Sequence, residues 1–178
     1  MTPVQIALWT VLGVALVISV VTDVLRREIL DAVTYPLMAV ALGVRFFTEG
    51  LGDLEHGVLS GVVAGVGLAV LLLPAALRGR MGWGDVKLMG GVGAVLGFPA
   101  AMAAAAFISL VGALQAVVTL LWQGAVWDTL AAAVRRWAAR ARLASADARP
   151  APQRHIPYGV AIALGTFWAL WWQHGSLG

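Results

Sequence analysis

The chain has 178 residues, of which 61% are hydrophobic and only 12% are charged, and its mean hydropathy is +0.88. Soluble domains average roughly 45–50% apolar and about 25% charged residues, so this composition predicts a protein of the lipid bilayer. The absence of cysteine excludes disulfides, thiolate catalysis and metal sites built on cysteine. A net charge of +3 would suggest nucleic acid as a partner in a soluble protein, but here the basic residues sit in a few loops, as membrane orientation requires. We therefore expect membrane lipids, and no nucleic acid, as partners.

Six apolar segments approach the length of about 20 residues that a helix needs to cross the hydrocarbon core. In chain order they are Val4–Thr22, Ala32–Phe47, Val58–Leu77, Val86–Gly97, Pro99–Trp122 and Ile156–Trp172. The fourth is too short to cross alone, and the first lacks the cleavage site of a removed signal peptide. Because backbone in lipid must satisfy its own hydrogen bonds, we expect one all-α domain over residues 1–178, a polytopic membrane bundle of about six transmembrane helices.

The basic residues predict the orientation of these spans. If the spans alternate in direction, eleven of the twelve lysines and arginines fall at one face: Arg26, Arg27, Arg78, Arg80, Lys87, Arg135, Arg136, Arg140, Arg142, Arg149 and Arg154. The other face has only Arg45. Since positive residues stay cytoplasmic, the basic face is expected to be cytoplasmic and both termini are expected to lie outside.

The connection at about 123–154 is the one long segment between spans. Trp127, Leu130, Val134 and Trp137 recur at helical spacing, and arginines fill much of the rest. This pattern favours a cytoplasmic amphipathic helix lying on an anionic membrane surface. A solvated basic linker is the alternative.

Two carboxylates stand at the predicted cytoplasmic face. Asp23 directly follows the apolar span that ends at Thr22, and Asp85 precedes the apolar stretch 86–97. Taken alone, Asp85 fits a helix N-cap as well as it fits a functional site. Taken together, the two acids lie at one depth on one face, where neighbouring carboxyls share a proton. One carboxylate can then draw a proton from water while the other carboxyl polarises a peptide carbonyl, which predicts amide hydrolysis.

The residues around Asp85 fit such a site. Gly82 and Gly84 let the backbone bend sharply and let another chain approach closely, as an extended peptide substrate requires. The three histidines of the chain, His56, His155 and His174, are isolated from one another in sequence. We therefore expect no metal site and no cofactor.

Three stretches resemble the prepilin peptidase family, which are membrane aspartic proteases of the GxGD type. Asp23–Pro36 resembles the first-aspartate segment of the family, Gly82–Leu88 resembles its GxGDxKL segment, and Ile156–Ala163 resembles its final-helix motif. Leu30 and Val160 stand where the family usually has proline. These departures concern positions that shape the backbone and leave both acids in place.

The resemblance implies an activity and a class of substrate. It implies an aspartic endopeptidase of the inner (cytoplasmic) membrane that removes the short basic leader of type IV pilin-like precursors at the cytoplasmic face. Larger members also methylate the new N-terminus through an additional domain with paired cysteines. This chain has no cysteine, so it resembles the short, peptidase-only kind found beside tight-adherence pilus systems. An archaeal-type preflagellin peptidase is the nearest alternative.

Three more charged residues lie close to the two acids in sequence. Glu28 and Asp31 are the acids available at this face to attract the lysine or arginine of a basic leader. Asp31 is expected mainly to cap the second span at Ala32 rather than to act in catalysis. Lys87 is expected to anchor the cytoplasmic interface, with electrostatic tuning of Asp85 as a second possibility.

A small ion or proton transporter is the rival from another class of protein. In that case Asp23 and Asp85 would bind a cation at a broken helix. The sequence disfavours a transporter, because both acids sit at one face rather than at the midplane and no second half repeats the first. A structural subunit of pilus assembly is a third interpretation.

Overall fold

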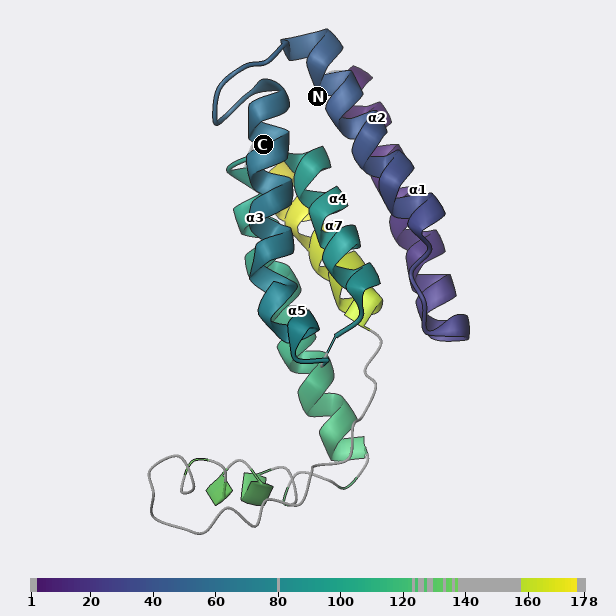
Figure 1. Cartoon of the computed structure of the whole chain (residues 1–178), viewed down its shortest axis with the longest axis vertical. Helices are drawn as coiled ribbons and strands as arrows, with labels where there is room; N and C mark the ends of the chain where they lie inside the picture. The colour runs from purple at the N-terminus through teal and green to yellow at the C-terminus, as the bar shows by residue number, and fades with distance from the viewer. Residues whose placement is uncertain are drawn as a thin grey trace. The chain divides into compact units, whose positions relative to one another are not determined.

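The computed structural model describes residues 3–79, 81–122 and 158–175, together with scattered residues between 124 and 137. Every regular element in these parts of the chain is an α-helix (Figure 1). In chain order the helices are α1 (Pro3–Arg26), α2 (Asp31–Glu49), α3 (Gly57–Leu77), α4 (Trp83–Leu96), α5 (Ala100–Trp122) and α7 (Tyr158–Gly175). The prediction of an all-α membrane bundle is confirmed.

The helices follow the predicted spans closely in sequence, but they differ in length and hydropathy. Among the described helices, α1, α3 and α5 are long and apolar enough to cross a membrane. With 14 residues, α4 rises only about 21 Å, which is less than the roughly 30 Å of the hydrocarbon core. Crossing by α2, α4 and α7 therefore stays a prediction.

Helix α4 is buried by its neighbours along most of its length. Its buried residues include Asp85, Val86 and every position from Leu88 to Val95. Helices α2 and α3 make the larger contacts with it, and α1 and α7 make smaller ones. Because protein covers α4 on its sides, this short helix needs little lipid contact, and Asp85 and Val86 in its first turn are buried among the other helices.

Small residues bring α3 and α4 close together. A Cβ atom added at Gly93 would lie 2.5 Å from the carbonyl oxygen of Ala64, and one added at Gly65 would lie 2.9 Å from the carbonyl oxygen of Gly90. Small residues at helix interfaces in membranes allow such backbone approach. The contact fixes the position of α4 against α3.

The far end of α4 is capped by a buried arginine. Arg45, on α2, donates from Nε to the Ala94 carbonyl at 3.1 Å and from Nη2 to the Val95 carbonyl at 2.9 Å. Its guanidinium also lies 3.5 Å from the Glu49 carboxylate. The last carbonyls of a helix have no partner within the helix, so Arg45 satisfies two of them and anchors α4 at this end.

Residue contacts divide the chain into two units. The first comprises Met1–Gly112 and Pro157–Gly178, and the second comprises Ala113–Ile156. Helix α5 begins in the first unit and ends in the second. The predicted amphipathic helix at about 123–154 falls for the most part outside the described residues. All the contacts described below lie within the first unit.

Candidate active site

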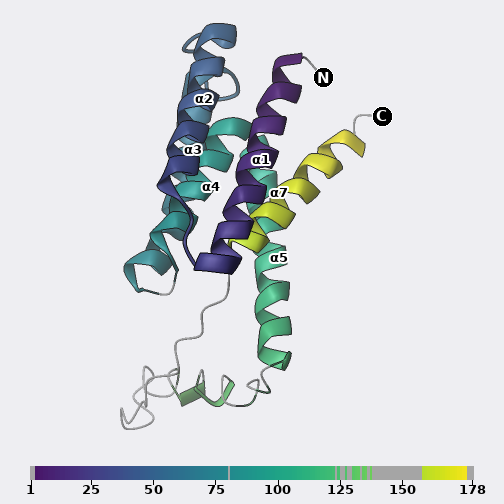
Figure 2. The same cartoon turned by 90° about the vertical axis from the view of Figure 1, so that its right-hand side faces the viewer.

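The ends of three helices meet at one end of the first unit. The C-terminal end of α1 and the N-terminal ends of α4 and α7 all point to the lower side of the view in Figure 1, and Figure 2 shows the same arrangement from the side. Asp23 lies in the last turn of α1 and Asp85 in the first turn of α4. Their exposed fractions are only 5% and 7%. The fold therefore brings both predicted acids to one end and buries them.

Asp23 is bound by the first turn of α7. Its Oδ2 accepts a hydrogen bond from the Gly159 amide at 2.9 Å, and this bond is buried. The first amides of a helix have no partner within it and carry a partial positive charge, so a carboxylate is well placed there. A Cβ atom at position 159 would lie 2.8 Å from Asp23 Oδ2. A larger residue at this position would force the Asp23 carboxylate to shift.

The Asp85 carboxylate has a hydrogen-bond partner for only one of its two oxygens among the described residues. Its Oδ2 accepts a hydrogen bond from the Gly82 amide at 3.2 Å, across the first turn of α4. Its Oδ1 is buried and has no hydrogen-bond partner among the described residues. The Asp23 carboxylate is close enough to act on Asp85 electrostatically. A buried oxygen of this kind is left free for a proton, a water molecule or a substrate group.

The two glycines predicted to shape the site have separate roles. Gly82 occupies the N-cap of α4 with extended backbone and supplies the amide that Asp85 accepts. Gly84 faces the segment between α1 and α2, where an added Cβ would lie 2.7 Å from the Cβ of Ile29. The glycines were expected to let another chain approach the backbone closely. At Gly84 the close neighbour is instead Ile29 of the same chain.

Asp31 does not cap α2, so that expectation was wrong. The helix begins at Asp31 itself, and the N-cap is Leu30, with no side-chain cap. Both carboxylate oxygens of Asp31 instead accept hydrogen bonds from Lys87 Nζ, at 2.7 and 2.8 Å. The ammonium of Lys87 also lies 5.0 Å from the centre of the Tyr35 ring. The full positive charge of Lys87, on α4, attracts the Asp31 carboxylate away from the backbone amides in the first turn of α2.

Glu28 and Tyr158 complete the surroundings. Glu28 is exposed in the short segment between α1 and α2. Tyr158, the first residue of α7, is half-buried. Its ring lies against Gly112 of α5, where a Cβ would come within 2.9 Å. Neither Tyr158 nor Gly159 was identified individually from the sequence, although a tyrosine and a glycine at the start of a helix offer a hydroxyl and free amides.

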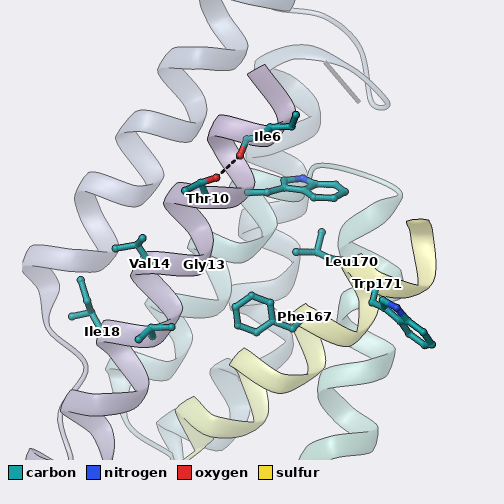
Figure 3. Close-up of a pocket in the computed structure, with 10 residues that line it drawn as sticks. Ile6, Thr10, Gly13, Val14, Ile18, Phe167, Leu170 and Trp171 are labelled. Carbon is teal, nitrogen blue, oxygen red and sulfur yellow. Dashed lines mark hydrogen bonds between the residues drawn. The ribbon is translucent and has the colours of Figure 1, made fainter. Parts of the chain in front are cut away.

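An apolar groove of about 660 Å³ lies elsewhere on α1. Figure 3 shows side chains of α1 and α7 on its two sides, including Val14, Ile18, Phe167 and Leu170. No acidic or basic residue lines it. The groove is therefore separate from the two acids and offers no group for hydrolysis.

Two buried carboxyls that interact are suited to acid–base chemistry on a peptide bond, because one can be ionised while the other holds a proton. The model of the type IV leader peptidase family matches residues 10–117, which include both acids, Gly82 and Gly84. No curated protein and no solved structure matches the chain. The family match covers more than half of the 178 residues, and it agrees with an all-helical membrane fold that buries two acids at one end. The chain belongs to the type IV leader peptidase family and is a membrane peptidase.

Proposed function

We propose that the protein is an aspartic endopeptidase in which Asp23 and Asp85 form the catalytic pair. The observation that carries this proposal is the burial of both carboxyls at one end of the first unit, within electrostatic range of each other. Membership of a peptidase family supports it. A cation site in a transporter would not require membership of such a family.

The surroundings of the two acids support a division of roles. The Gly159 amide at the start of α7 stabilises negative charge on Asp23, so Asp23 acts as the base. Asp85, with its free Oδ1, holds the shared proton. Asp23 takes a proton from water, the water oxygen bonds to the peptide carbon, and Asp85 gives its proton to the carbonyl oxygen.

Collapse of the tetrahedral intermediate completes the reaction. Asp23 passes its proton to the departing nitrogen as the carbon–nitrogen bond breaks. Asp85 recovers a proton from one hydroxyl of the intermediate as the new carboxyl group forms. Both acids return to their starting states, and the sum of the steps is the addition of one water molecule across one peptide bond.

The charge distribution supports a basic leader as the substrate and the cytoplasmic face as the place of cleavage. Eleven of the twelve basic residues fall on the face that carries Asp23 and Asp85 if the spans alternate, and the tendency of positive residues to stay cytoplasmic supports a site at the cytoplasmic side of the inner membrane. Glu28 is exposed near the site and can attract a leader lysine or arginine. We propose peptidase activity on type IV pilin-like precursors.

Cleavage by the purified protein tests this function. Wild-type protein in detergent is expected to cut a precursor peptide that carries a basic leader, and mass spectrometry of the products identifies the bond. Asp23→Asn and Asp85→Asn protein, purified to the same yield, should leave the peptide intact. Cleavage by either variant at the wild-type rate would contradict the assignment of that residue.

A further inference from the structure

A bidentate ion pair lies beside the two acids without touching them. Lys87 Nζ lies 2.7 and 2.8 Å from the two carboxylate oxygens of Asp31, although 56 positions separate these residues. Asp31 is the first residue of α2, and Lys87 follows Asp85 by two positions in α4. Tyr35, one turn further along α2, places its ring 5.0 Å from the same ammonium group. The start of α2 is thereby tied to the start of α4.

A second contact with the segment before α2 also holds the first turn of α4. On the other side of Asp85, Gly84 lies directly against Ile29 in the segment that leads to α2. Gly84 and Lys87 therefore both attach to residues 29–31, and Asp85 lies between them in sequence. Residues two positions apart on a helix do not face each other, which is why Lys87 can reach Asp31 while Asp85 stays buried.

The same segment begins at the other acid. Helix α1 closes with a hydrogen bond from the Arg27 amide to the Asp23 carbonyl, at 2.9 Å. Asp31 follows Asp23 by only eight positions. The ion pair between Asp31 and Lys87 therefore connects the backbone at Asp85 to the segment that follows Asp23 at the end of α1.

The exposure of the Asp31 and Lys87 side chains indicates whether their ion pair contributes to stability or to catalysis. The Asp31 side chain is 57% exposed and the Lys87 side chain 30% exposed, and ion pairs open to water add little to stability. Catalysis is far more sensitive to geometry than folding is, since a displacement of about 1 Å can cost about 10²-fold in rate. The effect of this pair is therefore expected in turnover and not in folding.

We propose that Asp31 and Lys87 are a positioning pair, which sets the first turn of α4 against the start of α2 and so holds Asp85 in place for its partner Asp23. This inference rests on the proposed function. It also replaces the helix-cap role expected for Asp31 and gives Lys87 a role beyond interface anchoring. Neither residue acts on the substrate in this account.

Steady-state kinetics of purified variants on a precursor peptide test the pair. Asp31→Asn and Lys87→Met are each expected to lower kcat about tenfold, with KM and melting temperature close to wild type. Because the two residues act as one unit, the double variant should lose no more than either single variant. Asp31→Glu and Lys87→Arg keep both charges and should retain most of kcat. Glu55→Gln, which removes one exposed acid between α2 and α3 at the opposite end, is the matched control and should leave kcat unchanged.

Wild-type kcat in Asp31→Asn would overturn the proposal, and so would a loss in the double variant equal to the product of the single losses. If Asp31→Asn does not fold, the conservative variants decide, because a folded Asp31→Glu or Lys87→Arg protein with kcat near zero would also overturn it. Asp23→Asn in the same assay distinguishes a failure of the proposed function from a failure of the positioning pair. Activity in Asp23→Asn would refute the proposed function, whereas an inactive Asp23→Asn beside a fully active Asp31→Asn would refute the positioning pair alone.

Discussion

At the scale of single residues, backbone amides hold both acids of the site. Gly159 donates to Asp23 from the start of α7, and Gly82 donates to Asp85 from the N-cap of α4. Each glycine leaves space that a side chain would fill. The sequence suggested that Gly82 shapes the backbone of the site, but it did not suggest a role for Gly159, because the residue that meets a helix terminus depends on how separate helices pack.

Substitution of Gly159 by alanine tests the contact with Asp23. The new methyl group would lie 2.8 Å from Asp23 Oδ2, so the carboxylate must move and lose its amide partner. We expect kcat to fall by about 10–100-fold, measured on a precursor peptide. Gly67→Ala is the matched control, since a Cβ there meets nothing within 4 Å. Equal kcat for Gly159→Ala and Gly67→Ala would show that Asp23 does not depend on this contact.

At the scale of elements, α4 is too short to cross a bilayer on its own and is instead held at several points. Glycines hold it against α3, Arg45 caps its last carbonyls, and Lys87 and Gly84 fix its first turn. The sequence predicted the short length of this stretch. It did not predict the capping by Arg45, which the sequence identified only as the single basic residue of its face and which is buried in the structure.

Substitution of Gly93 by alanine tests the contact between α3 and α4. A Cβ at this position would lie 2.5 Å from the backbone oxygen of Ala64, and backbone cannot rotate away as a side chain can. Overpacking of this kind typically costs about 1–3 kcal/mol, so the melting temperature in detergent should fall. Gly67→Ala, on the open face of α3, should match wild type or exceed it, because alanine favours helix. A wild-type melting temperature for Gly93→Ala would mean that the two helices are not this close.

At the scale of the whole molecule, the sequence predicted the features that depend on the order of the apolar segments and on the alternating direction of the helices. Alternation of helix direction alone places Asp23 and Asp85 at the same end, and the helix bounds followed from runs of apolar residues. Contacts between helices were not predictable in this way. Nearly all-apolar helices give little periodicity from which to infer the buried face, so neither the bond from Gly159 to Asp23 nor the pairing of Lys87 with Asp31 could be derived.

Reporter fusions test the orientation of the chain in the membrane. Because positive residues stay cytoplasmic, a reporter fused after Arg80 or Arg142 should be cytoplasmic, whereas a reporter near Asp53 should be exported. Enzymatic reporters active on only one side of the membrane measure this directly. An exported reporter at Arg142 would break the predicted alternation and the cytoplasmic placement of the site.

Comparison of single and double aspartate variants tests the catalytic pair most directly. Asp→Asn preserves size but removes ionisation, and general acid–base catalysis contributes about 10²–10⁴-fold. If Asp23 and Asp85 work as one unit, Asp23→Asn, Asp85→Asn and the double variant should show nearly the same residual rate on a precursor peptide, at least about 10²-fold below wild type. Either single variant cleaving at close to the wild-type rate, in correctly inserted protein, would contradict catalysis by this pair.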